Sequence, residues 1–231
     1  MAEFRKTGSC FNCSLKLNLF CFLSDEQLKM MDRNRQEVIY KPGETMFKTG
    51  GILTHIMCIT KGMVKIYIEG ENDKRILMGI IKSKQLVGGP GFLVDYRHHF
   101  TAVALEETTV CYLSVEDYRE VMKANPEFSM ELVKYLNERI IAHYSKIINL
   151  TQKHTHGKVA DMLIHLSDHI YMKDDFETAL SRQDMADMSS MTKESAIRVL
   201  KEFETDGLIV CNTHSFKILN KESLKQISKT G

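Results

Sequence analysis

Residues 181–207 read SRQDMADMSSMTKESAIRVLKEFETDG, a pattern typical of two short helices joined by a tight turn. Ser181 is the expected N-cap of the first helix, with Asp184 in its first turn. Thr192 is the expected N-cap of the second helix, and Ala186 is small enough to let the two helices cross closely. The stretch therefore predicts a helix-turn-helix.

The second predicted helix has two faces of different character. Its inner face carries Ala196, Val199, Leu200 and Phe203, and charged residues gather on the opposite face near its N-terminal end. In a helix-turn-helix reader, those N-terminal positions enter the DNA major groove. The candidate DNA-binding residues are Arg182, Thr192, Lys193, Glu194, Ser195, Arg198 and Lys201.

Two of these side chains suit the edges of bases. Arg198 can bond guanine O6 and N7 with two donors, and Glu194 can accept a hydrogen bond from cytosine N4. The alternative is a solvated amphipathic helix, because charge on an exposed helix face is common. Residues 207–220, GLIVCNTHSFKILN, are typical of a β-hairpin, which favours a winged helix with further backbone contacts from His214 and Lys217.

Length and charge limit the class of protein. A chain of 231 residues is long enough for two ordinary domains. Its formal net charge of +1 excludes a basic field over the whole molecule, so nucleic-acid binding must come from a local patch. No apolar run reaches the roughly 18–20 residues of a membrane span, and the N-terminus lacks a signal-peptide core. We expect a cytoplasmic protein with no membrane partner.

The region from Val38 to Leu113 has the texture of a β-roll. Short β-rich runs recur and are separated by turn signals such as Pro42-Gly43 and Lys61-Gly62. Many short strands at this spacing indicate a jelly-roll-like barrel. Together with the helical second half, the pattern predicts an α+β fold.

Pro126 opens a long predicted helix with a heptad seam. The seam residues are spaced by four, three, four and three positions, and they are Leu136, Ile140, His143, Ile147 and Leu150. A helix of about 25 residues is about 37 Å long, longer than a small barrel can cover, so we expect homodimerisation along it. The expected segments are a cysteine-containing stretch (1–22), the β-roll sensor (23–124), the dimerisation helix and hinge (125–152) and the winged helix-turn-helix (153–231).

This order of elements resembles the Crp/Fnr family of bacterial transcription regulators, from about Leu23 to the C-terminus. The most specific motifs are KPGETMFKTG, ITKGMVKIYIEG, LTQKHTHGKVADMLIHLSD and the helix-turn-helix. The resemblance implies a homodimer that binds a palindromic, TGA-containing promoter site and contacts RNA polymerase. Glu194 and Arg198 match the family's base readers, and Lys193 sits where base preference varies.

The resemblance also suggests which signals to consider. The cyclic-nucleotide branch pairs a phosphate with an Arg and a ribose hydroxyl with a Glu, and here Gly89 and His99 stand in those places. Arg97 is two positions away and would point the same way as His99 in a strand, whereas His98 would point to the opposite face. We therefore expect a degenerate pocket and no cyclic AMP. Its residues are Gly88, Gly89, Arg97, His98, His99 and Phe100.

The cysteines place the chain nearer the Fnr-type branch, whose members hold a [4Fe-4S] cluster. By that resemblance the ligands are Cys10, Cys13, Cys21 and Cys111. Four thiolates suit iron–sulfur or zinc. Cys21 falls about one helical turn late for the pattern, and the alternatives are packed or free thiols and a thiol redox switch.

Two other classes of protein are alternatives to a DNA-binding regulator. A small-molecule-sensing module that does not bind DNA is the main alternative, because this barrel also occurs in kinases and channels. The helix-turn-helix after the seam argues against that class. The barrel lacks the histidine and glutamate set of a metal-dependent cupin and shows no nucleophile motif, so we do not expect an enzyme.

Overall fold

The computed structural model describes residues 3–5, 9–13, 16–71 and 74–231. The chain folds into two units. The N-terminal unit comprises residues 1–68 and 79–140, and the C-terminal unit comprises residues 69–78 and 141–231. The expected α+β class, with an antiparallel sheet-rich first part, a long helix and a helix-turn-helix, is confirmed.

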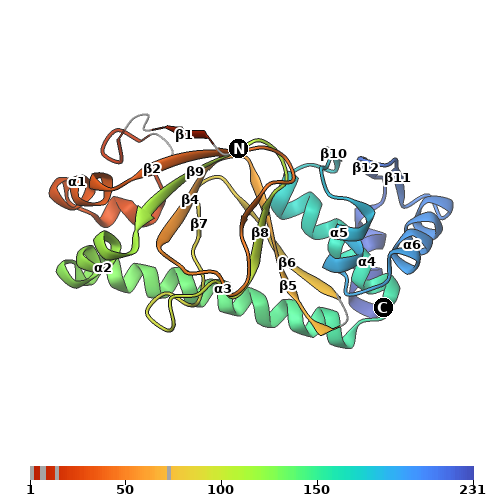
Figure 1. Cartoon of the computed structure of the whole chain (residues 1–231). Helices are drawn as coiled ribbons and strands as arrows, with labels where there is room; N and C mark the ends of the chain where they lie inside the picture. Colours follow the sequence, from red (N-terminus) through yellow and green to blue (C-terminus); the bar gives the residue numbers. More distant parts are fainter. Residues whose placement is uncertain (1–2, 6–8, 14–15, 72–73) are drawn as a thin grey trace. The chain divides into compact units, whose positions relative to one another are not determined.

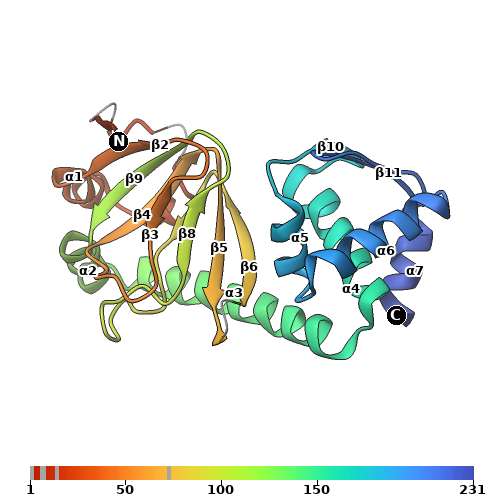
Figure 2. The same cartoon turned by 45° about the vertical axis from the view of Figure 1, so that its right-hand side comes forward.

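Two antiparallel sheets form the β-roll (Figures 1 and 2). One sheet has the order β1-β2-β9-β4-β7 and the other has the order β3-β8-β5-β6. The strands of the first sheet are β1 (Glu3–Arg5), β2 (Gln36–Tyr40), β9 (Thr108–Ser114), β4 (His55–Lys61) and β7 (Gln85–Val87). Those of the second sheet are β3 (Thr45–Phe47), β8 (Thr101–Ala104), β5 (Met63–Glu69) and β6 (Arg75–Lys82).

The turn from β4 to β5 depends on Gly62. Its φ is +87°, in the left-handed region that favours glycine. A Cβ at this position would lie 2.6 Å from the Glu107 carbonyl oxygen and 2.6 Å from Thr108 Oγ1. Glycine is therefore required both by the backbone angle and by the close approach of the neighbouring turn.

Helices pack beside the first sheet and enclose the core of the N-terminal unit. The helix α1 (Asp25–Arg33) begins at Ser24, which forms a capping box with Gln27 as the sequence predicts. Ser114 caps α2 (Val115–Ala124) by accepting hydrogen bonds from two backbone N–H groups. Tyr118 and Phe128 are almost fully buried in this core together with the short helix η1 (Asn18–Phe22).

The long helix α3 (Pro126–Gln152) has 27 residues and begins at Pro126 as expected. Its first turns are anchored by buried Phe128 and Leu132. Of the seam residues, Leu136, Ile140 and Ile147 are exposed in the single chain. His143 and Leu150 are half-buried. The exposed apolar positions of α3, which we call the α3 stripe, are Met130, Val133, Leu136, Ile140, Ile141, Tyr144, Ile147 and Ile148.

The C-terminal unit combines helices with a three-stranded sheet of order β10-β12-β11. Its helices are α4 (Thr155–His165), the π-helical η3 (Leu166–Tyr171), α5 (Arg182–Met188), α6 (Lys193–Thr205) and α7 (Lys221–Thr230). The strands are β10 (Asp175–Glu177), β11 (Ile209–Cys211) and β12 (Ser215–Ile218). Figure 2 shows α5 and α6 side by side, with β11 following α6, which is the arrangement of a winged helix-turn-helix.

The structure differs from the sequence-based expectations in two places. Residues 97–100 precede β8 and are not part of a strand; Arg97 makes only an isolated bridge with Ile52. Residues 173–178, where no strand is predicted, contain β10, which pairs with β12 across the sheet. None of the described helices combines the length and apolar character needed to cross a membrane.

Candidate nucleic-acid interface

The candidate recognition helix α6 starts where the sequence places it. The Thr192 Oγ1 accepts a hydrogen bond from the Ser195 backbone N–H at 3.2 Å, which caps the helix. In α5, Ser181 forms a capping box with Asp184. Both helices of the motif therefore begin at defined residues, and the turn between them is short.

Packing fixes the orientation of α6. Ala196, Val199, Leu200 and Phe203 are each at most 2% exposed, as the sequence predicts. Fully burying a valine, leucine or phenylalanine side chain contributes on the order of 1.5–3 kcal/mol, so Val199, Leu200 and Phe203 hold the helix on its apolar face. Its charged face is consequently turned outward.

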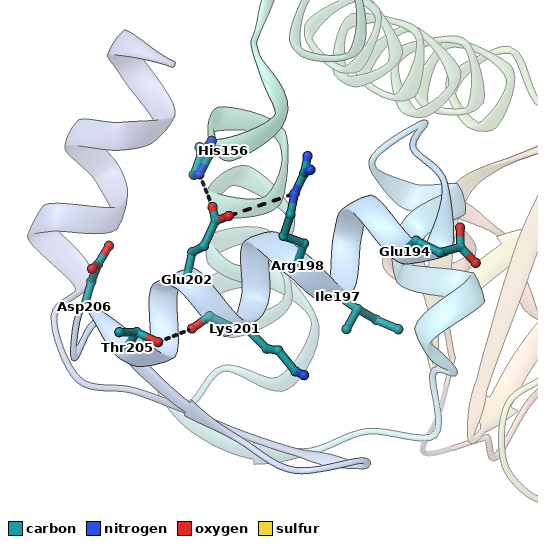
Figure 3. A pocket seen from close by; sticks show the side chains of 8 residues that line it. All are labelled: His156, Glu194, Ile197, Arg198, Lys201, Glu202, Thr205 and Asp206. Carbon is teal, nitrogen blue, oxygen red and sulfur yellow. Dashed lines mark hydrogen bonds and ion pairs between the residues drawn. The ribbon is translucent and has the colours of Figure 1, made fainter.

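The outward face of α6 borders an open hollow of about 810 Å³. Its lining side chains, drawn in Figure 3, are His156, Glu194, Ile197, Arg198, Lys201, Glu202, Thr205 and Asp206. Of the predicted DNA-binding residues, Lys193, Glu194, Arg198 and Lys201 are exposed on α6. The side chains expected to contact bases therefore share one accessible surface.

Arg198 makes contacts that the sequence reading missed. Its Nε lies 3.9 Å from Glu202 Oε1, and the other carboxylate oxygen of Glu202 lies 2.6 Å from His156 Nε2 (Figure 3). Glu202 follows Arg198 by four positions, which is a recognisable helical ion-pair spacing. His156 is 46 residues from Glu202 and carries no local signal for this contact.

The remaining predicted DNA-binding residues have structural roles in the chain. Arg182 donates from Nη2 to the Asn212 carbonyl oxygen at 2.5 Å, and its guanidinium lies 4.8 Å from the Phe216 ring centroid. Arg182 thus joins α5 to the β-hairpin. The hydroxyls of Thr192 and Ser195 are 3.1 Å apart at the helix cap, so capping occupies both residues.

The residues of the degenerate effector pocket do not form one cluster of exposed donors. Arg97 donates from Nη1 to the Gly50 carbonyl oxygen at 2.9 Å, and His99 pairs with Asp95 at 3.0 Å. His98 is buried, its ring stacks on Phe47 with centroids 3.7 Å apart, and burial lowers its pKa. Phe100 also contacts the Phe47 ring.

Gly88 and Gly89 lie against the apolar residues of the N-terminal unit. A Cβ at Gly88 would approach Ile56 Cδ1 at 3.2 Å, and one at Gly89 would lie 3.7 Å from Leu53 Cδ1. These neighbours are hydrocarbon groups. The arginine nearest in sequence, Arg97, donates its hydrogen bond to the Gly50 backbone carbonyl. The described side chains here show no arginine–glutamate pair of the kind that binds a cyclic nucleotide.

The cysteines expected to hold a cluster are arranged differently from a ligand set. Cys21 is exposed, whereas Cys111 is buried and accepts a hydrogen bond from Arg35 Nη1 at 3.4 Å. Burial and the nearby Asp32 raise the pKa of Cys10 to about 12, which favours the thiol over the metal-binding thiolate. Within the described ranges, no three His, Cys, Asp or Glu side chains are placed to hold a metal ion. The described side chains do not bring all four predicted thiols together as one ligand set.

The position of Cys58 was not anticipated as relevant to this group. Cys58 on β4 lies directly opposite Cys111 on β9, so both side chains face the same side of the sheet. Both are buried. Beside Cys111 lies the guanidinium of Arg35, whose Nε is 2.8 Å from Asp32 Oδ1 and whose Nη1 is 3.7 Å from Glu37 Oε2.

Comparison with known proteins agrees with the two units. Residues 37–125 match a family model described as a cyclic nucleotide-binding domain, and residues 157–227 match a Crp-like helix-turn-helix domain. The chain is 24% identical over 226 residues to the fumarate and nitrate reduction regulatory protein of Escherichia coli K12, covering 95% of this chain and 90% of that protein. It is 24% identical over 229 residues to the transcriptional activator protein FnrA of Stutzerimonas stutzeri, covering 95% of this chain and 92% of FnrA.

A solved structure has the same fold. The structure of FixK2 from Bradyrhizobium japonicum superposes with a TM-score of 0.77 at 16% sequence identity. The match covers 85% of this chain and 98% of FixK2.

Proposed function

This chain belongs to the Crp/Fnr family of transcription regulators, and we propose that it binds a palindromic promoter site as a homodimer. The helix-turn-helix is its DNA-binding domain, and the chain is not an enzyme. The observation that carries the proposal is the exposed face of α6. Lys193, Glu194 and Arg198 are exposed there while the opposite face of the helix is buried.

The chemistry of this face favours base reading. An α-helix fits the B-DNA major groove, where Arg198 can donate to guanine O6 and N7 and Glu194 can accept from cytosine N4. Glu194 alone would repel phosphates, so its place on this face is best explained by a contact to a base. A half-site containing TGA presents both partners, since its guanine pairs with a cytosine on the other strand. Lys201 would supply a phosphate contact.

The α3 stripe supports the homodimer. Its apolar side chains are exposed to solvent in the single chain, and exposed apolar surface of this kind marks interaction sites. The heptad spacing suits a copy of the same helix, as in a coiled coil. A twofold dimer would present two α6 helices and would therefore require a palindromic site. RNA polymerase is a further proposed partner.

We place the controlling signal at the β-roll of the N-terminal unit. The support is the match of residues 37–125 to the cyclic nucleotide-binding domain, a fold that binds ligands. Cyclic AMP is not the proposed ligand, because Gly89 and His99 replace the residues that would contact ribose and phosphate. We propose that the β-roll responds to a small molecule or signal other than cyclic AMP.

The decisive experiment measures sequence-specific binding by the full-length chain. Fluorescence anisotropy with a palindromic TGA…TCA duplex and a scrambled duplex of equal length should show tighter binding to the palindrome, on the order of 10³-fold or more. Sedimentation should show two chains per duplex. Equal affinities at several salt concentrations would contradict the proposal and favour the module that senses a small molecule without binding DNA.

A redox signal held by a cysteine-bound cluster is the alternative to a small-molecule effector, and it has its own test. The arrangement around Arg35 does not fit a cluster, so we expect anaerobically purified protein to be colourless and free of iron. Four iron atoms per chain, lost on exposure to air, would contradict that expectation and make oxygen the signal. The C21S variant would then show whether Cys21 is a ligand.

A further inference from the structure

The guanidinium of Arg198 is held on one side only. Its Nε faces Glu202 Oε1 at 3.9 Å, and the two terminal nitrogens are directed away from that carboxylate (Figure 3). The side chain is 69% exposed, so the terminal nitrogens are accessible. Reading guanine with two hydrogen bonds needs two such donors in a fixed plane.

Glu202 is itself held by a different helix. Its Oε2 lies 2.6 Å from Nε2 of His156, in the first turn of α4. The His156 ring lies 5.9 Å from the ring of Phe203, a residue that is only 1% exposed. The Glu202 carboxylate therefore has one partner on α6, Arg198, and one on α4, His156. The His156 ring lies beside a residue of the apolar core.

We propose that Glu202 is a positioning residue that orients Arg198 for base reading and is held in place by His156. This inference rests on the proposed DNA-binding function. Holding a flexible side chain in its bound geometry before the encounter reduces the conformational entropy lost on binding. Exposed ion pairs contribute little to folding stability, so the effect should appear in DNA binding.

Simple electrostatics makes the opposite prediction for this residue. Glu202 places a negative charge on a surface that approaches phosphates, so removing it should strengthen binding to every duplex. A positioning role instead predicts that removing it weakens discrimination for the base that Arg198 reads. The two accounts therefore differ in one quantity, the ratio of the affinities for DNA with and without the base that Arg198 reads. The ratio can distinguish them even if both affinities change.

The experiment compares two palindromic duplexes and one random duplex by fluorescence anisotropy. In the second palindrome, the half-site G·C pairs are replaced by A·T pairs. For wild type, the affinity ratio between the two palindromes measures discrimination at that base. Glu202→Ala should lower this ratio about three- to tenfold, with random-duplex affinity unchanged or higher. Glu202→Gln keeps an acceptor oxygen and should lower it less.

A double-mutant cycle tests whether the effect passes through Arg198. In an Arg198→Ala background, adding Glu202→Ala should leave the ratio unchanged, because the positioned group is absent. Asp206→Asn is the matched control, since it removes one negative charge from the same hollow at the C-terminal end of α6, where no contact with Arg198 is drawn (Figure 3). It should raise all three affinities without changing the ratio.

Three results would count against the positioning role. An unchanged ratio in Glu202→Ala would overturn it, as would a ratio that falls equally in the Arg198→Ala background. Far-ultraviolet circular dichroism and the melting temperature show whether each variant is folded. If wild type itself does not prefer the palindrome to random DNA, the base-reading function fails and this inference fails with it. A wild type that discriminates through Arg198 but not through Glu202 rejects the inference alone.

Discussion

Arg35 and Arg198 are both paired with a carboxylate, yet their surroundings are opposite. The Arg35 side chain is 3% exposed and directs its nitrogens at Asp32, Glu37 and Cys111. The Arg198 side chain is 69% exposed and has its carboxylate partner at Nε. One guanidinium is enclosed by its own chain, and the other is presented to solvent.

This difference in exposure predicts that the two arginines contribute to different properties, folding stability in one case and DNA binding in the other. A buried guanidinium must satisfy its donors internally, because an unpaired charge in the core costs several kcal/mol. An exposed one contributes little to folding and is available to an outside partner. We therefore expect changes at Arg35 to act on stability and changes at Arg198 to act on DNA binding.

The largest expected effect is at Arg35. Arg35→Met leaves the carboxylates of Asp32 and Glu37 without their buried cation, and we expect the free energy of unfolding to fall by about 3–5 kcal/mol. Urea unfolding of the full chain measures it. Arg33→Met, at the exposed last residue of α1 and two positions before Arg35, should change it by no more than about 0.5 kcal/mol. Equal stability of the two variants would show that the Arg35 network is not structural.

The next effect is at Arg198 and should spare the fold. Arg198→Ala would remove the two proposed hydrogen bonds to guanine and should weaken binding to the palindrome by about 1–3 kcal/mol per half-site. Binding to random DNA should fall only by the loss of one charge, and the melting temperature should stay the same. Equal losses on both duplexes would reduce Arg198 to a phosphate contact.

A smaller effect is expected in the acid range. Burial alone would raise the pKa of Asp32, but the hydrogen bonds from Arg35 and from the Cys10 backbone N–H lower it below the ordinary value. A carboxylate with a lowered folded-state pKa stabilises the protein above its unfolded pKa of about 4, and this contribution is lost as the pH falls through the lower folded value.

Replacing Asp32 tests this acid dependence. Asp32→Asn should reduce the loss of stability between pH 4 and lower pH, measured by urea unfolding at several pH values. At neutral pH it should also be less stable than wild type. An unaltered acid slope in the variant would assign the acid sensitivity to other carboxylates.

The smallest effect concerns a third arginine, Arg97. Its Nη1 donates to the Gly50 carbonyl oxygen, so it is directed at backbone. Cyclic AMP should therefore shift the melting temperature by less than about 1 °C at millimolar concentration, whereas a ligand at 100 times its Kd would add about 2.7 kcal/mol of stability. A saturable shift would show that the nucleotide is bound by other residues.

The helix-turn-helix was predictable from sequence because its signals are local. Ser181 and Thr192 cap their helices within three residues, and the apolar spacing of α6 predicted which side chains are buried. The long helix was equally clear from Pro126 and the heptad seam. These features depend on neighbours along the chain, which the sequence displays directly.

What the sequence did not reveal depends on distant partners. The strand β10 has three residues, too few to show alternation, and it exists because it pairs with β12. The pair His156–Glu202 joins positions 46 residues apart, and Arg35 reaches Cys111 across 76 residues. The cysteine hypothesis came from the family resemblance, and a resemblance cannot show that a guanidinium lies beside Cys111.

The α3 stripe has a consequence for how such a regulator would respond to its own abundance. If two chains must dimerise along the α3 stripe before the protein binds its promoter site tightly, the concentration of dimer–DNA complexes rises with the square of the chain concentration. This holds as long as most chains are monomers. Halving expression would then reduce promoter occupancy about fourfold in that regime. A polar substitution such as Ile147→Glu should extend this steep regime to higher concentrations, while leaving each recognition helix chemically intact.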